Sequence, residues 1–305
     1  MVKNRSLSIS NSNILMRSFL IKSIKFVFTC LVAYYFIVFS YNSIDIRQRF
    51  KKINGHRLLI LGDSQLQRLE TDLVGDSTYN FASSGEFYLV TYHKLLRLID
   101  QNPGKFNAVL LGISVHSFAP TYNRLMNVDF FDGQSSLERY FYFLPLSESW
   151  TFAHHEPSRL FKSIDKTTEW GGAFSSVRSN PDSSIINETL RSHYGIQKNE
   201  GRFCDEQSLY LKKIDSLCIA KQIRLVLVTC PYHQDYLSKV DSSYIVHYQT
   251  VLSSLRTKAH ISFLDDRVRP EWMSDACHLN RSGSAVYSMR IKQALDSMNQ
   301  TVYFP

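Results

Sequence analysis

Short apolar runs alternate with longer segments of helical periodicity along most of this 305-residue chain, and this alternation limits its fold more than any other feature. Five of the runs have the length and composition of buried strands. They cover residues 56–62, 77–82, 106–114, 224–230 and 261–266. Strands that alternate with helices are typical of a mostly parallel sheet covered on both faces. The sequence therefore predicts a three-layer α/β fold with a five-stranded sheet.

The segments between the strands complete this prediction. Helical patterns occupy residues 64–74, 87–100, 205–222, 242–259 and 280–298. Residues 119–203 lack the alternation and are rich in aromatic and turn residues. We therefore expect one domain over 57–305 that carries an aromatic-rich insertion at about 119–203.

The N-terminal segment differs from this domain in charge and hydropathy. Residues 1–54 hold nine basic residues and one acid, and nine minus one equals the whole net charge of +8. The rest of the chain is formally neutral, so we expect no nucleic-acid partner. Residues 26–44 contain no charged residue, which predicts a transmembrane signal-anchor helix between a basic tail, 1–25, and a linker, 45–56. A cleaved signal peptide and a buried core helix are the alternatives.

The sequence gives less direct evidence for the side of the membrane on which the domain lies. Basic residues flank the uncharged run on both sides, so the distribution of positive charge does not fix its orientation. An N-terminal anchor with a large C-terminal domain most often exports that domain. We therefore expect a single-pass membrane protein, attached to the bilayer by its N-terminal helix, with its domain outside the cytoplasm. The four cysteines of the domain either form two disulfides there or are small buried apolar residues. They are Cys204, Cys218, Cys230 and Cys277.

Polar residues gather where the predicted strands end, and this is where parallel α/β sheets bind their ligands. In chain order they are Gly62-Asp63-Ser64, Gly85, Ser114, His116, Asp275 and His278. A serine hydroxyl is a poor nucleophile until an imidazole removes its proton, and a carboxylate can orient that imidazole. Ser64, His278 and Asp275 are therefore candidates for a catalytic triad. The alternatives are structural: Ser64 caps a helix through Gln67, and Asp275 caps the last helix beside a solvated His278.

These residues resemble the motifs of the SGNH/GDSL-type hydrolase superfamily. Gly62-Asp63-Ser64 matches its first block, and Asp275-Ala276-Cys277-His278 matches its last, over a body of about 56–118 and 205–298. The resemblance implies a flavodoxin-like fold and catalytic Ser64, Asp275 and His278. It also implies an oxyanion hole formed by Ser64, Gly85 and Ser114.

One position departs from that family. Ser114 stands where the third block usually has an asparagine that donates to the oxyanion. Loss of one such donor typically lowers turnover about 10²–10³-fold. His116, two residues further on, is a candidate replacement.

The resemblance also implies a class of function. A membrane-anchored member is similar to the branch that acts on acyl groups of envelope or exported polysaccharides, often beside a multi-spanning membrane O-acyltransferase. We therefore expect a serine esterase or O-acyltransferase that acts on acylated carbohydrate or another ester. The alternative is an inactive scaffold of the same fold that partners a membrane O-acyltransferase. A lipase that faces the cytosol would follow from an inverted anchor.

Other candidate sites are weaker. The chain has no P-loop, no dinucleotide-binding glycine pattern and no metal-ligand spacing, so we expect neither a cofactor nor a metal. His154-His155 could line a pocket or lie at the surface, and His93 is expected to be solvated. Asp265 and Asp266 are adjacent, so their side chains should point to different sides and share no acid–base role.

Overall fold

The structure is a computed structural model that describes residues 5–53, 55–127, 145, 181–195 and 201–301. Its contacts divide the chain into two units, Met1–Arg49 and Phe50–Pro305. Most of the predicted insertion, including His154 and His155, lies outside the described residues.

Helix α1 (Arg5–Lys52) provides the described part of the N-terminal unit and extends into the second, and it includes the uncharged run at 26–44. Several apolar side chains of α1 are exposed, among them Phe26, Phe36 and Ile37. In the part of the chain that the structure describes, no helix combines the length and the apolar character needed to cross a membrane. The predicted membrane-spanning helix therefore has no support from the structure.

The larger unit is built on a five-stranded sheet, as the sequence predicts. Its strands are β1 (Leu58–Leu61), β2 (Thr78–Asn80), β3 (Ala108–Gly112), β4 (Arg224–Thr229) and β5 (His260–Ser262). They lie in the order β2-β1-β3-β4-β5, and every neighbouring pair is parallel. This order is that of a flavodoxin-like sheet. The strands are short apolar runs because both faces of such a sheet are buried.

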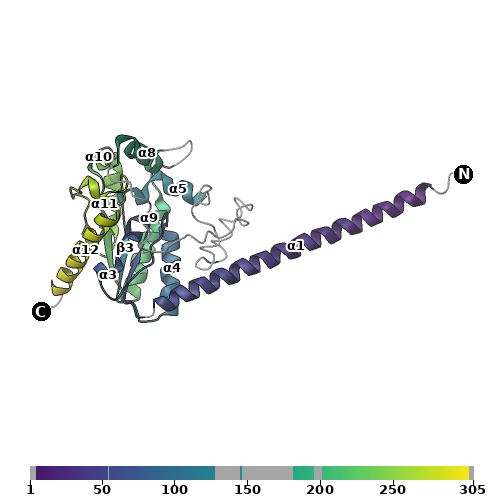
Figure 1. Cartoon of the computed structure of the whole chain (residues 1–305), viewed down its shortest axis with the longest axis horizontal. Helices are drawn as coiled ribbons and strands as arrows, with labels where there is room; N and C mark the ends of the chain where they lie inside the picture. The colour runs from purple at the N-terminus through teal and green to yellow at the C-terminus, as the bar shows by residue number, and fades with distance from the viewer. Residues whose placement is uncertain (1–4, 54, 128–144, 146–180, 196–200, 302–305) are drawn as a thin grey trace. The chain divides into compact units, whose positions relative to one another are not determined.

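Helices cover this sheet. The longer ones are α4 (Tyr88–Gln101), α8 (Ser183–Tyr194), α9 (Asp205–Ala220), α11 (Ser242–Ser254) and α12 (Arg281–Thr301). The shorter ones are α2 (Ser64–Gln67), α3 (Thr71–Val74), η1 (Val115–Phe118), α5 (Pro120–Asn127), α10 (Gln234–Leu237) and η4 (Pro270–Trp272). Helix α3 packs on α12, and α4 packs on α9. Figure 1 shows α12 and α4 on opposite sides of β3. The fold therefore has the helix–sheet–helix layers expected of right-handed crossovers.

One predicted helix is wrong in detail. The pattern over 64–74 suggests a single helix, but the chain forms α2 and α3 with a break between them. The side chain of Asn80 donates to the carbonyl of Leu66 at 2.8 Å, and Ser288 Oγ accepts from the N–H of Glu70 at 3.0 Å. These side chains replace the hydrogen bonds that a continuous helix would make, so the break is stable.

The C-terminal ends of β1 and β3 approach each other closely. Gly62 has a φ of +125°, and a Cβ at this position would lie 3.0 Å from the backbone nitrogen of Gly112. Only glycine fits such a conformation and such a contact. The connections that follow β1 and β3 lead to helices on opposite faces of the sheet, because α3 packs on α12 and α9 packs on α4. Ligands bind at this kind of position in open α/β sheets.

The cysteines favour the second of the two sequence alternatives. All five are free, and Cys204, Cys218, Cys230 and Cys277 are buried. They therefore act as small apolar residues of the core, and the two disulfides do not form.

Candidate active site

Ser64 lies at the first position of α2, directly after the turn that ends β1. Asp63 caps this helix, because its Oδ1 accepts from the backbone N–H of Gln65 at 3.0 Å. The alternative in which Ser64 acts as the cap is therefore wrong. The Ser64 hydroxyl is instead 2.7 Å from Nε2 of His278, although the two residues are 214 positions apart in the chain.

The loop after η4 carries the histidine and an aspartate. Nδ1 of His278 is 2.9 Å from both carboxylate oxygens of Asp275. Burial by itself would raise the pKa of Asp275. The hydrogen bond and the charge of His278, with the backbone N–H of Cys277, outweigh burial and hold that pKa well below its usual value. Asp275 is thus ionised and fixes the ring so that Nε2 faces the serine.

Two side chains tie this loop to α2. Gln65 Nε2 donates to the carbonyl of Cys277 at 3.1 Å. Arg68 is buried, and it donates to Ser274 Oγ and, at 2.8 Å, to the carbonyl of Leu279. These contacts position the histidine loop against the helix that carries Ser64, which explains how residues from opposite ends of the domain come within hydrogen-bond distance.

The three residues predicted to form an oxyanion hole differ in their hydrogen bonds. The backbone N–H groups of Ser64 and Gly85 donate to no acceptor among the residues that the structure describes. Gly85 has a φ of +66°, and a Cβ there would meet nothing within 4 Å. Ser114 differs, because its Oγ is already 2.8 Å from Ser117 Oγ. Two of the three predicted donors are therefore open, and the third is engaged.

A buried ion pair supports the loop that carries Gly85. Glu86 bonds to the ammonium group of Lys94, and both side chains have 0% exposure. Lys94 also donates to the carbonyl of Phe81, and Thr91 donates to Glu86 Oε1 at 2.7 Å. Breaking such a pair costs about 3–5 kcal/mol. The pair therefore holds the loop between β2 and α4 in place, and no local motif in the sequence indicates it.

A second aspartate and a second histidine flank Ser64 from the other side. Asp63 Oδ2 is 3.8 Å from Nε2 of His116, and both side chains are buried. Burial raises the pKa of Asp63, and the N–H of Gln65 offsets this only in part. Burial, with a smaller contribution from His278, lowers the pKa of His116 to about 3. His116 is therefore a neutral imidazole at physiological pH.

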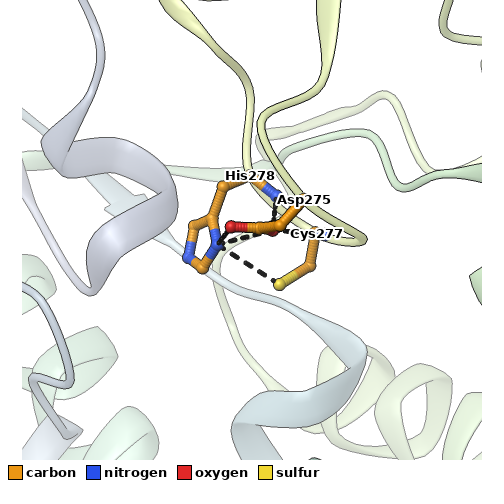
Figure 2. Close-up of side chains that lie close together, drawn as sticks. All are labelled: Asp275, Cys277 and His278. Atoms are coloured by element: carbon orange, nitrogen blue, oxygen red, sulfur yellow. Dashed lines mark hydrogen bonds and ion pairs between the residues drawn. The ribbon is translucent and has the colours of Figure 1, made fainter. Parts of the chain in front are cut away.

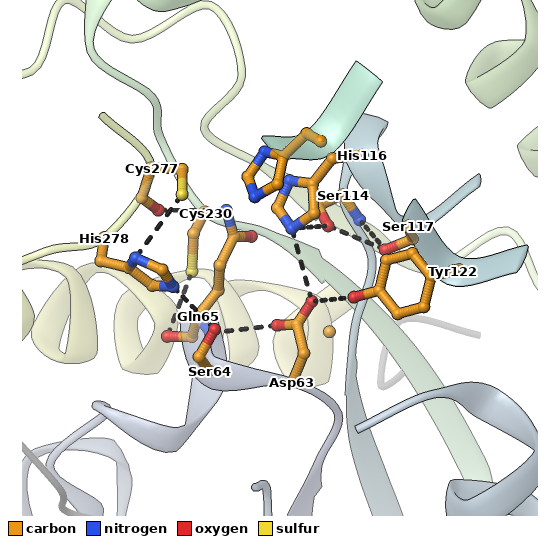
Figure 3. Close-up of polar contacts among 12 residues, drawn as sticks. Asp63, Ser64, Gln65, Ser114, His116, Ser117, Tyr122, Cys230, Cys277 and His278 are labelled. Atoms are coloured by element: carbon orange, nitrogen blue, oxygen red, sulfur yellow. Dashed lines mark hydrogen bonds and ion pairs between the residues drawn. The ribbon is translucent and has the colours of Figure 1, made fainter. Parts of the chain in front are cut away.

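Three residues complete this side of the site. Tyr122 donates to Asp63 Oδ2 at 3.4 Å, and Tyr232 OH is 3.0 Å from Nδ1 of His116. The ring of His193 stacks on that of His116 with 4.3 Å between centroids. Figure 3 shows the contacts of Asp63 with Tyr122 and His116 beside Ser64. The position of Tyr232 just beyond the fourth predicted strand could have indicated it, whereas nothing in the sequence indicates His193.

Asp275, Cys277 and His278 also form a group of metal-ligand types, with donor atoms within 4.8 Å of one another. Figure 2 shows the contacts of Asp275 and Cys277 converging on Nδ1 of His278. A metal would need the thiolate, but burial raises the pKa of Cys277 well above its usual value. Nδ1 is also engaged by the carboxylate. The donor set therefore fits an oriented histidine better than a metal site.

The weaker candidates have structural contacts. His93 is half-buried and packs edge-on against Tyr92, so the expectation of a solvated side chain is wrong. Asp266 pairs with Arg290 and accepts from Tyr287 OH at 3.2 Å. Asp265 is exposed and makes none of these contacts.

Comparison with known proteins gives no family. No protein-family model matches the chain, and no curated protein is significantly similar to it.

Proposed function

We propose that this protein is a serine esterase or O-acyltransferase that works through an acyl-Ser64 intermediate. The observation that carries the proposal is the line of contacts from Ser64 Oγ to His278 Nε2 at 2.7 Å and from His278 Nδ1 to Asp275 at 2.9 Å. Each residue also lies where a parallel α/β sheet binds its ligands. The resemblance to SGNH/GDSL-type hydrolases is consistent with this proposal and remains a hypothesis.

Ser64, His278 and Asp275 have different roles in the proposed reaction. As Ser64 Oγ attacks the acyl carbon, its proton passes to Nε2 of His278, and the carbonyl oxygen becomes negatively charged. The open N–H groups of Ser64 and Gly85 are suited to bind this charge. The bond to the leaving oxygen then breaks, and His278 returns the proton to that oxygen. Asp275 stabilises the imidazolium in the meantime.

The second half of the reaction decides between hydrolase and transferase. Water or an acceptor hydroxyl loses its proton to His278 and attacks the acyl carbon. The bond from that carbon to Ser64 Oγ then breaks, and His278 returns the proton to Oγ. We propose an acylated carbohydrate or another envelope-associated ester as the substrate, from the resemblance alone. A multi-spanning membrane O-acyltransferase is the proposed partner on the same basis.

We also propose that residues 26–44 attach the protein to a membrane, with its larger unit outside the cytoplasm. The support is the absence of charge in this run, together with the basic residues on both sides of it. A phosphatase reporter that works only outside the cytoplasm, fused at the C-terminus, should be active. Release of the protein from membranes by an alkaline carbonate wash would contradict attachment through this run.

One observation favours the alternative function, an inactive scaffold for an acyltransferase. Ser114 Oγ is engaged by Ser117 and is not open toward the site, unlike the asparagine amide that the family usually has there. Against this, the contacts of Ser64, His278 and Asp275 are complete.

Labelling with a fluorophosphonate tests the proposal directly. The full chain in detergent should become labelled, and Ser64→Ala should not. Ser253→Ala is the matched control, because Ser253 is an exposed serine on α11 that hydrogen-bonds its own helix. Undiminished labelling of Ser64→Ala would contradict the proposal. A folded wild-type chain that does not react would favour the scaffold.

A further inference from the structure

The engaged hydroxyl of Ser114 leaves the proposed acyl-transfer site with two open oxyanion donors where three are expected. His116 lies two residues after this position, on η1, and the residue is only 5% exposed. A buried imidazole normally satisfies both ring nitrogens. The contacts of His116 therefore show whether one of its nitrogens is available.

The first ring nitrogen has a clear partner. Nδ1 of His116 is 3.0 Å from the hydroxyl of Tyr232. Burial raises the pKa of Tyr232 well above its usual value, so this hydroxyl keeps its proton and can donate it to Nδ1. Because neutral histidine carries one ring proton, an accepting Nδ1 places that proton on Nε2.

The second ring nitrogen has no close acceptor. Among the described residues, Nε2 of His116 has only Ser114 Oγ at 3.4 Å and Asp63 Oδ2 at 3.8 Å. Both distances exceed the usual 2.7–3.2 Å of an N–H···O hydrogen bond. A buried N–H without a close acceptor is costly and is often found at functional sites. This N–H faces Asp63, the residue directly before the proposed nucleophile.

The ring is also held in place. His193, from α8, stacks on it with an interplanar angle of 16°, and Nδ1 of His193 is 2.7 Å from Tyr236 OH. Tyr236 stacks in turn on Tyr232. The imidazole therefore sits in a rigid aromatic setting, as an oxyanion donor requires. In the view of Figure 3, His116 lies on the side of Ser64 opposite to His278.

We propose that His116 is a catalytic residue whose Nε2–H donates a hydrogen bond to the oxyanion formed when Ser64 attacks an ester. This inference rests on the proposed function and adds a third donor to the N–H groups of Ser64 and Gly85. The proton stays on Nε2 throughout, and only the hydrogen bond forms and breaks. Tyr232 and His193 are positioning residues, because they act through His116.

Steady-state hydrolysis of p-nitrophenyl acetate by the full chain in detergent tests this role. His116→Leu should lower kcat about 10²–10³-fold with little change in KM, because the donor acts only in the transition state. His116→Asn keeps an N–H donor, so it should have a higher kcat than His116→Leu. Its kcat should be at least a tenth of the wild-type value. His93→Leu is the matched control, because it removes a half-buried histidine outside the site.

A second readout separates catalysis from folding. A phenylboronic acid forms a tetrahedral adduct with an active serine, so its inhibition constant should rise in His116→Leu by about the same factor as kcat falls. Tyr232→Phe, which keeps the ring, should lower kcat roughly 5-fold through the lost hydrogen bond. If His116→Leu does not fold, the kcat of Tyr232→Phe tests the proposal instead.

The two proposals fail in different ways. If turnover depends on Ser64 but folded His116→Leu keeps the wild-type kcat, the role of His116 is wrong and the proposed function stands. If the wild-type chain shows no turnover that depends on Ser64, both are wrong. Equal losses of kcat in His116→Leu and His93→Leu would also overturn the role of His116.

Discussion

Two pairs of aspartate and histidine flank Ser64, and they differ in almost every physical property. The His278 and Asp275 side chains are 19% and 31% exposed and lie 2.9 Å apart. The His116 and Asp63 side chains are 6% and 8% exposed and lie 3.8 Å apart. The pKa of Asp275 is held below its usual value, and that of Asp63 is raised. The same two residue types therefore form a hydrogen-bonded pair with an ionised carboxylate on one side, and a neutral histidine beside a carboxyl on the other.

The difference follows from hydrogen bonding and burial. Asp275 accepts from the His278 ring and from the backbone N–H groups of Cys277 and His278, which favours the charged form. Asp63 is more buried and has fewer donors, so desolvation dominates. Environments that separate the pKa values of like groups also separate their roles. The partly exposed pair, His278 and Asp275, is suited to proton transfer. The buried pair, His116 and Asp63, is suited to holding a fixed hydrogen-bond donor.

The largest expected effect comes from breaking the exposed pair. Asp275→Asn should lower kcat about 10³–10⁴-fold, because the amide no longer fixes the useful tautomer of His278 or stabilises its charged form. Hydrolysis of p-nitrophenyl acetate measures this loss. Asp265→Asn, an exposed aspartate after β5, should leave the rate unchanged. A loss below about 10-fold would mean that His278 does not depend on its carboxylate.

A smaller effect concerns the buried pair and the pH dependence of stability. The raised pKa of Asp63 favours its protonated form in the folded state, so its contribution to stability is full below the unfolded pKa and is lost as pH rises through the folded pKa. Asp63→Asn removes this titration. The free energy of unfolding of the variant, relative to wild type, should therefore increase between about pH 4 and about pH 7.5.

Urea unfolding at the two pH values measures this change. Asp265→Asn again serves as the control and should show no such trend, since Asp265 is exposed. A relative stability of Asp63→Asn that falls with increasing pH would contradict the assignment, because it would mean that the folded state favours the ionised carboxylate.

The smallest expected effect concerns the hydrogen bond between Tyr122 and Asp63 of the buried pair. Tyr122 donates to Asp63 over a long distance of 3.4 Å. Tyr122→Phe should therefore lower the free energy of unfolding by only about 0.5–1.5 kcal/mol, the usual contribution of one hydrogen bond. Thermal or urea unfolding would show this. A loss well above about 3 kcal/mol would mean that Tyr122 is part of a tighter network than the distances indicate.

The sequence predicted the sheet well, because buried parallel strands are short continuous apolar runs. It did not predict the break between α2 and α3, since the acceptors and donors come from Asn80 and Ser288, distant in the chain. Ser64, Asp275 and His278 could be grouped because each follows a strand end. The pairing of Asp63 with His116 could not be predicted, because these residues come together only in the folded sheet and through side chains such as Tyr232.

The distance in sequence between Ser64 and His278 has a consequence for the synthesis of the protein. The hydroxyl and its histidine are 214 residues apart, and they meet only when the loop after β5 has docked on α2. At about 5–20 residues per second, a ribosome needs roughly 10–40 s to travel between the two codons. During that time Ser64 has no base, so nascent and truncated chains carry an ordinary serine. In the proposed function, Ser64 therefore becomes reactive only after residue 278 has been synthesised and its loop has docked on α2.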